Sequence, residues 1–355
     1  MNNSAMTDGQ TNIQTPETLP LVTVAIPTLN EERYITRCLQ SIKNQTWPIG
    51  RMEVLIIDAF STDGTRKKAN EFATKTGMDI KILDNPGKIQ ARAINIAIKY
   101  AHGEVFVRMD AHSIYNPRYV ETAVRKLAEN PEVWNVGGYW TIRPANDSDK
   151  AFAIARSFAN PFGGGNATYR TTGVRTQKFV DTVPYGAYPI KVFDKLGMYD
   201  NDTWIGEDVE FNSRILRHGK KILITPEMDI EYMFKASSFR DVWRRNYLFG
   251  TWLFRRKSGR GLRHFIPMLF VIFLLSAPVL VAINPVFLLL WAIGIVLYLT
   301  TAVFFILRHE KPAPNLRRIL LMLVSFIVMH AGFGIGSIVS MVKYAWRSKV
   351  PEIKP

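Results

Sequence analysis

The sequence contains a single cysteine, Cys38, so no disulfide can form within the chain. It also lacks a hydrophobic leader, because residues 1–20 are polar, and this predicts a disordered N-terminus without a secretory signal peptide. Both absences favour the cytoplasm for the domain that follows. The chain has 355 residues, which is enough for one large core or two domains and excludes small disulfide-stapled scaffolds.

Charged residues are missing from three long apolar segments. Phe265–Ile283, Pro285–Leu307 and Ile319–Val342 contain no Asp, Glu, Lys or Arg. At about 20 residues per hydrocarbon thickness, each can cross a bilayer as a helix, which predicts a multi-pass membrane domain of two or three helices over residues 263–342. The glycine-rich middle of the third segment, HAGFGIGS, leaves open the alternative that it bends and re-enters the same side.

Acidic residues are scarcer than basic ones, with 30 against 45, and the net charge is +15. Such an excess can indicate a nucleic-acid binder, but eight of the basic residues lie between Arg240 and Arg263, directly before the first apolar segment. Basic residues beside a span stay on the cytoplasmic side and attract anionic lipid headgroups. We therefore expect no nucleic-acid partner and a location at the inner (cytoplasmic) membrane, with the preceding domain facing the cytoplasm.

Two short segments flank the membrane domain. In residues 238–262, helical periodicity separates most arginines from the aromatic side chains, which predicts an interfacial amphipathic helix, although a plain stop-transfer flank would explain the charge alone. Residues 343–355 form a basic tail, which would face outward if all three apolar segments spanned the bilayer.

Residues 21–237 resemble a soluble domain. Apolar, β-branched runs alternate with helical patterns. The predicted strands are Leu21–Pro27, Glu53–Asp58, Asp79–Leu83 and Glu104–Asp110, and the predicted helices are Glu31–Gln45, Gly64–Thr76 and Gly87–Ala101. This alternation predicts an α/β fold with a doubly wound parallel sheet, in which ligands bind beyond the carboxyl ends of the strands.

Several side chains at that predicted rim suit nucleotide or metal chemistry. Asp110 and His112 project from the same face of an extended segment, and together they favour a divalent ion, with the imidazole favouring Mn²⁺ over Mg²⁺. The alternative is a surface histidine beside a capping aspartate. Asp58 ends a strand without a local backbone partner to explain it, so it is expected to accept hydrogen bonds from a base or ribose.

Two further motifs allow a functional and a purely structural interpretation. The loop IPTLNEE either forms a wall of a nucleotide site or supplies Asn30 as a helix cap, with acids that complement the helix dipole. Glu207 and Asp208 begin a predicted helix, where they either stabilise its first turn or supply a general base.

Taken together and in order, the motifs resemble those of the inverting glycosyltransferases of family 2, which have the GT-A fold. The resemblance is carried by IPTLNEE, DAFSTDGT, VRMDAHSIY, NPFGGGNATYR, GEDVEFNSRILRHGKKI and RRNYLFGTW. The chain is most similar to their membrane-bound bacterial exopolysaccharide branch, of the succinoglycan type, from about Val22 to Lys257.

The resemblance implies roles for individual residues. It implies nucleotide-sugar binding by Pro27, Glu31, Asp58, Lys88, Asp110, Arg245 and Asn246. Asp110 with His112 corresponds to the Asp-x-Asp element, which holds a divalent metal, Mn²⁺ or Mg²⁺. Asp208 matches the catalytic base, with Glu207 as the second catalytic candidate. His112 and Asn246 depart from the family's usual aspartate and glutamine.

The implied function is that of a hexosyltransferase whose GT-A domain covers residues 21–237. It is expected to move a sugar, with inversion, from a nucleotide sugar to a polyprenyl-diphosphate-linked saccharide. The alternatives are transfer to a polyprenyl phosphate itself and a non-catalytic membrane scaffold that binds nucleotide sugars. A processive synthase that exports its polymer would need more spans than this chain offers.

Overall fold

The computed structural model describes residues 18–165, 167–171, 173–254 and 264–347. The predicted disordered N-terminus lies outside these residues except for residues 18–20. Residues 255–262 of the predicted interfacial segment and 348–355 of the predicted basic tail also lie outside them.

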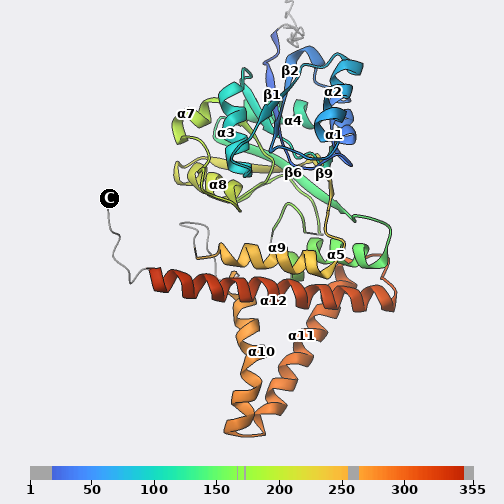
Figure 1. The fold of residues 1–355 in the computed structure, drawn as a ribbon, viewed down its shortest axis with the longest axis vertical. Coiled ribbons are helices and arrows are strands. Elements are labelled where there is room, and N and C mark those ends of the chain that lie inside the picture. Colours follow the sequence, from blue (N-terminus) through green and yellow to red (C-terminus); the bar gives the residue numbers. More distant parts are fainter. Residues whose placement is uncertain (1–17, 166, 172, 255–263, 348–355) are drawn as a thin grey trace, which may run out of the picture.

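The globular part is built on one nine-stranded sheet, in the order β3-β2-β1-β4-β8-β6-β9-β5, with β7 paired to β9 (Figure 1). The first four strands are β1 (Val22–Thr28), β2 (Met52–Asp58), β3 (Ile80–Asp84) and β4 (Val105–Arg108). They are mutually parallel and are joined by α1 (Ile35–Lys43), α2 (Thr65–Thr76) and α3 (Gln90–Tyr100). The predicted strand and helix alternation is confirmed in this half.

The second half of the sheet lies beyond the four predicted strands and is mixed rather than parallel. Its strands are β5 (Ser113–Tyr115), β6 (Val133–Arg143), β7 (Lys178–Phe179), β8 (Ala187–Pro189) and β9 (Lys221–Met233). Its helices are α4 (Tyr119–Glu129), α5 (Asp149–Ala159), α6 (Pro161–Gly164), α7 (Lys191–Leu196) and α8 (Glu207–Arg217), and a 3₁₀ turn, η2 (Ile49–Arg51), precedes β2. The short strand β8 runs antiparallel to both β4 and β6, which reverses the direction in mid-sheet.

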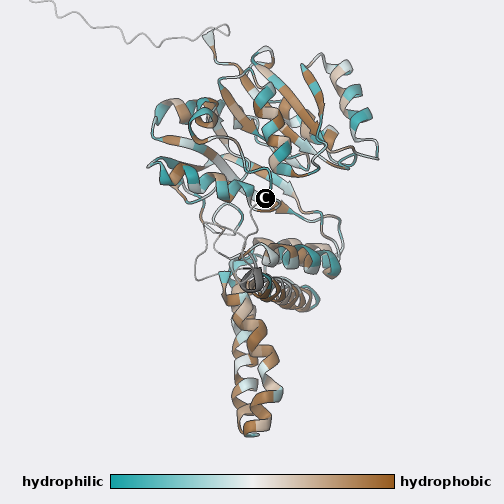
Figure 2. Cartoon of the chain, turned by 60° about the vertical axis from the view of Figure 1, so that its left-hand side comes forward, coloured by the Kyte–Doolittle hydropathy of each residue, from teal (hydrophilic) through white to brown (hydrophobic). Residues whose placement is uncertain are grey.

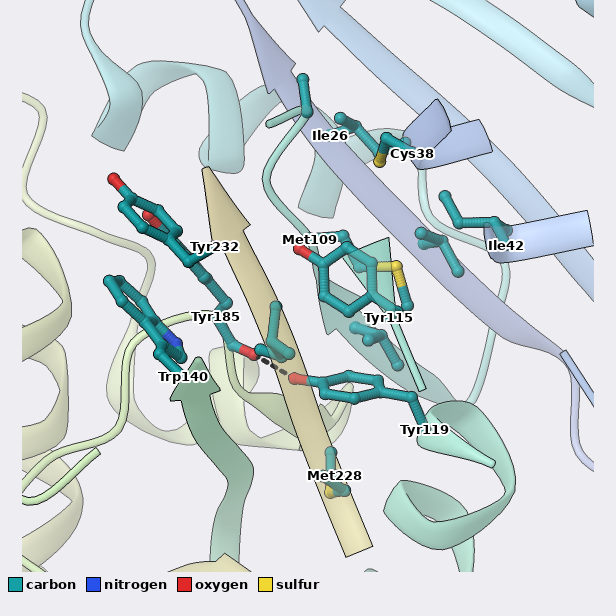
Figure 3. Packing of buried hydrophobic residues seen from close by; sticks show 14 of the residues in the cluster. Ile26, Cys38, Ile42, Met109, Tyr115, Tyr119, Trp140, Tyr185, Met228 and Tyr232 are labelled. Carbon is teal, nitrogen blue, oxygen red and sulfur yellow. Dashed lines mark hydrogen bonds between the residues drawn. The ribbon is translucent and has the colours of Figure 1, made fainter. Parts of the chain in front are cut away.

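Burial on both faces explains the unbroken apolar runs of the central strands. Successive residues of a strand point to opposite faces. In β1, Val24 and Ile26 accordingly pack into one core and Ala25 into the other. Figure 3 shows part of the first core, where the Tyr119 hydroxyl donates to the Tyr185 carbonyl at 2.7 Å.

The C-terminal helices have two orientations. They are α9 (Phe239–Thr251), α10 (Ile266–Ile283), α11 (Phe287–His309) and α12 (Leu316–Arg347). Helices α10 and α11 form a hairpin that extends away from the sheet, whereas α12 lies across its base beside α9 and α5 (Figures 1 and 2). By length and composition alone, α10, α11 and most of α12 are apolar enough to cross a membrane. We call α5, α9 and α12 the platform.

The re-entrant alternative for the third apolar segment is wrong, because α12 is a continuous helix from Leu316 to Arg347. Its glycines permit close helix packing instead. A Cβ added at Gly336 would lie 2.2 Å from the Tyr247 carbonyl oxygen of α9, and one at Gly334 would lie 2.2 Å from the Pro267 carbonyl oxygen of α10. Small residues at such contacts let helix backbones approach each other.

Polar contacts join α5 and α6 to α11 and α12. The Arg318 guanidinium of α12 lies 2.7 Å from the Asp149 carboxylate of α5. Asn160 donates to the Phe305 carbonyl of α11 at 3.1 Å, and the His330 ring lies 3.0 Å from the Phe162 carbonyl of α6. The α5–α6 segment therefore ties the globular domain to α11 and α12.

The orientation of α12 predicts where the C-terminus lies. Because α12 lies across the hairpin, we expect a reporter fused after Pro355 to be on the same side of the membrane as one fused at the N-terminus. The basic residues near both ends of α12, Arg317, Arg318 and Lys343, fit that arrangement. A reporter inserted at Asn284, between α10 and α11, is the control and should lie on the other side. A C-terminal reporter found beside the Asn284 reporter would contradict a transverse α12.

Candidate active site

A cleft of about 560 Å³ lies between the strand ends and the platform. Pro27, Ile57 and Arg108, from the ends of β1, β2 and β4, line one side. Phe249 of α9 and Phe333 of α12 line another. The predicted site residues that line it are Pro27, Glu31, Lys88, Asp110, His112, Glu207, Asp208 and Arg245. The strand-end rim thus meets a surface made by the platform.

One acid of the β1–α1 loop, Glu31, meets the segment after β4 in a three-residue cluster. Glu31, Asp110 and His112 each offer one ligand atom, and these atoms lie within 4.8 Å of one another. His112 Nδ1 lies 3.1 Å from Glu31 Oε1 and 3.4 Å from Asp110 Oδ1. The structure thereby adds Glu31, which the sequence assigned to the nucleotide, to the predicted pair.

The cluster has the properties of a divalent-cation site. Two carboxylates and one imidazole suit Mn²⁺, and the Glu31 Oε2 atom is buried without a hydrogen-bond partner among the described residues. Burial lowers the pKa of His112, but the Asp110 carboxylate outweighs it together with Tyr232 and Glu31, so the pKa rises to about 9. The Lys235 ammonium also contacts Glu31. The two carboxylates of the cluster therefore attract positive charge, as those of a metal site do.

An aromatic stack forms the wall beside this cluster. The Trp140 ring stacks on Tyr185 with centroids 4.9 Å apart and on Tyr232 with centroids 4.3 Å apart (Figure 3). The Tyr232 ring in turn meets the His112 imidazole edge-on at 5.0 Å. Because all three rings also line the cleft, this wall joins the hydrophobic core to the site.

Asp58 does not have the environment that the sequence predicted. Its carboxylate accepts hydrogen bonds from the Ser61 N–H at 2.9 Å, the Ser61 hydroxyl at 2.5 Å and the Thr28 hydroxyl at 3.2 Å. The expectation that it lacks a local backbone partner is therefore wrong. The side chain is fully buried and does not line the cleft, although its neighbours Ile57 and Ala59 do. Asp58 thus fixes the loop that forms one wall.

Asn30 and Asn246 also differ from expectation. Helix α1 begins at Ile35, so Asn30 does not cap it; its side-chain oxygen accepts from the Thr62 N–H at 2.9 Å. Asn246 is absent from the cleft lining, and its amide donates to the Val242 carbonyl within α9 at 2.8 Å. Its position against Gly332 of α12 makes it part of the platform packing.

Glu207 and Asp208 have different environments at the start of α8. Gly206, with φ of 76°, turns the chain into the helix. Glu207 is buried and pairs with Arg108 at 2.8 Å, and burial raises the pKa of Glu207 while Arg108 opposes the rise. Asp208 is half-buried, lines the cleft and accepts only from the Val209 N–H among the described residues. Its carboxylate is therefore the one available for chemistry.

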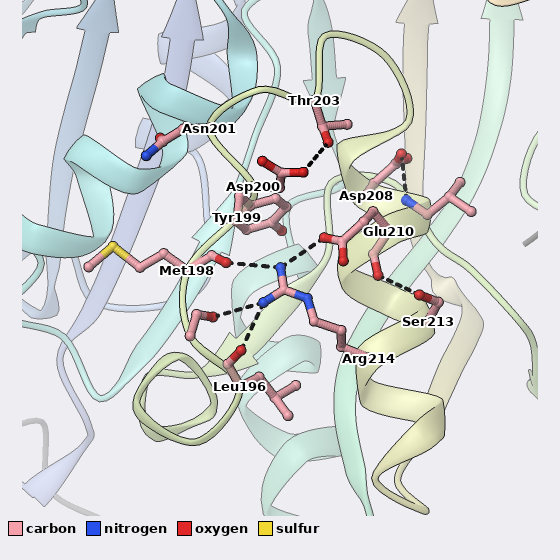
Figure 4. A network of polar contacts seen from close by, with 12 residues as sticks. Leu196, Met198, Tyr199, Asp200, Asn201, Thr203, Asp208, Glu210, Ser213 and Arg214 are labelled. Carbon is pink, nitrogen blue, oxygen red and sulfur yellow. Dashed lines mark hydrogen bonds and ion pairs between the residues drawn. The ribbon is translucent and has the colours of Figure 1, made fainter. Parts of the chain in front are cut away.

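The loop before α8 is held by a basic side chain of the same helix. Arg214 donates to the carbonyls of Leu196 at 2.8 Å and Met198 at 2.9 Å, and it pairs with Glu210 at 2.9 Å (Figure 4). These contacts join the end of α7 to α8. They thereby fix the segment that leads to Asp208.

Among the basic residues of the cleft lining, sequence reasoning missed three: Arg108, Arg170 and Lys235. An arginine inside the apolar strand run EVFVRMD was the one available signal, because a buried cation requires a partner. Lys235 lies far along the chain from Glu31, which it contacts, and nothing in its local sequence marks it. Arg170 is the last residue of the motif NPFGGGNATYR, which supported the family resemblance without giving this arginine a role.

Comparisons with known proteins give a consistent result. A sequence model described as "Glycosyl transferase family 2" matches residues 23–186. The Methanococcus voltae protein "Dolichyl N-acetyl-alpha-D-glucosaminyl phosphate 3-beta-D-2,3-diacetamido-2,3-dideoxy-beta-D-glucuronosyltransferase" is 31% identical over 264 residues, which cover 72% of this chain and 80% of that protein. "Succinoglycan biosynthesis protein ExoA" of Rhizobium meliloti is 28% identical over 261 residues, covering 69% of this chain and 74% of that protein.

A solved structure shows the same fold. The mannosyltransferase PcManGT from Pyrobaculum calidifontis, in complex with GDP-Man and Mn²⁺, superposes with a TM-score of 0.55 at 22% identity. The match covers 94% of this chain and 89% of that one. The predicted fold class, an α/β domain of the GT-A type followed by apolar helices, is thereby confirmed.

The three-residue cluster predicts metal binding. We expect Mn²⁺ to raise the thermal unfolding temperature of the purified protein, and Asp110→Asn or His112→Ala to remove that rise, because each deletes a ligand. Asp79→Asn, which changes an exposed acid outside the cleft, is the control and should retain the full rise. An unchanged Mn²⁺ response in Asp110→Asn would contradict this assignment.

The buried pair predicts a stability difference between two glutamates of α8. Glu207→Gln leaves the Arg108 guanidinium buried without a counter-charge, which costs about 3 to 5 kcal/mol for such pairs. Glu210→Gln breaks the less buried pair with Arg214, at a cost below about 1 kcal/mol. Thermal unfolding should therefore show a large loss for the first variant and a small one for the second. Equal losses would mean that the buried Arg108–Glu207 pair stabilises the fold no more than the Glu210–Arg214 pair does.

Proposed function

The chain belongs to glycosyltransferase family 2 and is a glycosyltransferase, and from this premise we propose that it transfers a sugar from a nucleotide sugar to a lipid-linked saccharide at the membrane. The observation that carries the proposal is the composition of the cleft, which is lined both by the strand-end acids and by the platform. A soluble donor can enter from the strand-end side. An acceptor held in lipid must approach from the platform.

The named relatives support this acceptor class. The Methanococcus voltae protein is named for a dolichyl-phosphate-linked sugar substrate, and the Rhizobium meliloti protein is named for succinoglycan biosynthesis. We therefore propose a polyprenyl-diphosphate-linked saccharide as acceptor, with a polyprenyl phosphate itself as the second candidate. The basic residues before α10 fit anionic lipid headgroups at a cytoplasmic face, so we propose that the globular domain lies there.

The proposed chemistry assigns separate tasks to the two sets of carboxylates. Asp208 removes the proton of the acceptor hydroxyl as that oxygen attacks the anomeric carbon, and this single displacement inverts the anomeric centre. The Arg108–Glu207 pair holds the start of α8, which fixes Asp208. Glu31, Asp110 and His112 would hold Mn²⁺ or Mg²⁺, which offsets charge on the leaving diphosphate. Lys88, an exposed cation of the lining, can contact the same diphosphate.

We assign the loops after β1 and β2 to the wall of the cleft that contacts the nucleotide-sugar donor. Pro27 and Glu31 lie in the cleft lining, and Asp58 supports the wall from behind through Thr28 and Ser61. We propose that the nucleotide lies against this wall.

The proposal is tested by Asp208→Asn. We expect the variant to fold and to bind nucleoside diphosphate with Mn²⁺ as the unaltered protein does, but to lose about 100-fold or more of its transfer rate, because the amide cannot accept the acceptor proton. The measurement is transfer of labelled sugar from a panel of nucleotide sugars to lipid-linked acceptors in purified protein.

Asp202→Asn is the matched control, because this exposed acid of the preceding loop does not line the cleft. It should keep the full transfer rate. Retained transfer in Asp208→Asn removes Asp208 from the role of base. Nucleotide binding by the unaltered protein without transfer to any acceptor would favour the non-catalytic scaffold.

A further inference from the structure

Two arginines of the cleft, from distant parts of the chain, converge on the ring of the buried Phe158 behind it. The Arg170 guanidinium lies 3.9 Å from the ring centroid of Phe158 in α5, and the Arg245 guanidinium of α9 lies 4.8 Å from the same centroid. Arg245 also lies 5.1 Å from Phe234 and 5.4 Å from Phe249. Both arginines are half-buried, and both line the cleft.

Neither arginine is paired with an acid among the described residues. Arg170 donates to the Gly164 carbonyl at 2.8 Å, while its Nε atom is buried and has no hydrogen-bond partner there. Burial, with Arg245 adding to it, lowers the pKa of Arg170 from its ordinary value. Two neighbouring guanidinium groups without a counter-charge are costly, and a phosphate would relieve that cost through bidentate hydrogen bonds.

The elements that carry these arginines place them at the level of the membrane helices. Arg170 follows α6, which contacts His330 of α12 through the Phe162 carbonyl. Arg245 belongs to α9, which packs on α12 through closely approaching glycines. Apart from Arg245, the lining from α9, the residues that follow it and α12 is apolar and consists of Phe249, Trp252, Leu253 and Phe333. This part of the cleft therefore combines two cations with an apolar wall.

We assign the donor diphosphate to other groups in the cleft, although the family resemblance implied nucleotide-sugar binding for Arg245. Glu31, Asp110 and His112 come from the loop after β1 and the segment after β4, and Lys88 precedes α3. These groups lie on elements of the strand-end rim, whereas Arg170 and Arg245 lie on elements of the membrane side. A reaction between a nucleotide sugar and a lipid-linked acceptor brings two phosphorylated groups to one cleft, and the cleft offers two separate sets of charges.

We propose that Arg170 and Arg245 bind the phosphate of the lipid-linked acceptor, with its first isoprene units against Phe249, Trp252, Leu253 and Phe333. The proposal rests on the proposed function for the identity of the lipid. It also sets the acceptor's direction of approach, because the phosphate is then held at the platform while the sugar end points toward Asp208.

The test measures lipid binding separately from transfer. Full-length protein is reconstituted in phosphatidylcholine nanodiscs, and its affinity is measured for undecaprenyl phosphate, for the uncharged undecaprenol and for nucleoside diphosphate with Mn²⁺. We expect Arg170→Gln and Arg245→Gln each to weaken undecaprenyl phosphate binding about tenfold or more, since each removes a charged hydrogen-bond donor. Nucleoside diphosphate affinity and undecaprenol binding should not change.

Arg244→Gln is the matched control, because this exposed arginine neighbours Arg245 in α9 but does not line the cleft. It should bind all three probes normally. Arg170→Lys and Arg245→Lys keep the charge and lose the bidentate geometry, so an intermediate loss of undecaprenyl phosphate binding supports the proposal even if a glutamine variant fails to fold.

Three outcomes overturn the proposal. In the first, the unaltered protein binds undecaprenyl phosphate no better than undecaprenol. In the second, the arginine variants bind undecaprenyl phosphate as well as the unaltered protein does. In the third, the variants lose affinity for nucleoside diphosphate rather than for undecaprenyl phosphate, which would assign the arginines to the donor. The proposed function fails separately. Unaltered protein that binds the lipid through these arginines but transfers no sugar would contradict the function and leave the site intact.

Discussion

The close contact between α9 and α12 is the constraint on which the membrane side of the site depends. A Cβ at Gly250 would lie 2.1 Å from the Phe333 carbonyl oxygen, so the two helices touch backbone to backbone. That approach brings Phe333 of α12 and Arg245 of α9 into one cleft lining. A larger residue at Gly250 or Gly336 would push the two helices apart, and the part of the cleft lining that α9 and α12 form would move with them. The glycines of α12 therefore position the site from outside it.

The two sides of the cleft are built by different physical means. The strand-end side depends on parallel strands that finish together, which brings Glu31 and Asp110 from different loops into one cluster. The platform side depends on helix packing and on polar contacts such as the one between Arg318 and Asp149. A shift of the platform relative to the sheet would change the distance between the two sides. The α5–α6 segment, which bonds to α11 and α12, opposes such a shift.

Much of this arrangement follows from the sequence, and the exceptions have identifiable causes. The first four strands and Asp208 could be predicted, because their signals are local: apolar runs, and acids at a helix start. The pairing of Glu31 with His112 depends on how two strand ends align, and Arg170 reaches Phe158 only after the chain has folded back. The environment of Asp58 was predicted wrongly, because its partner Ser61 is brought to it by the conformation of the loop, which the sequence pattern does not reveal. The glycines of α12 left a bend open as an alternative, whereas in the structure they allow close contact with other helices.

The transverse position of α12 has a consequence for what happens after the reaction. In the described part of the chain, α10 and α11 are the helices that extend away from the domain, and two packed helices cannot enclose a polar conduit. Under the proposed function, these two helices alone give a polar saccharide no route across the bilayer, so the product would remain on the face where it is made.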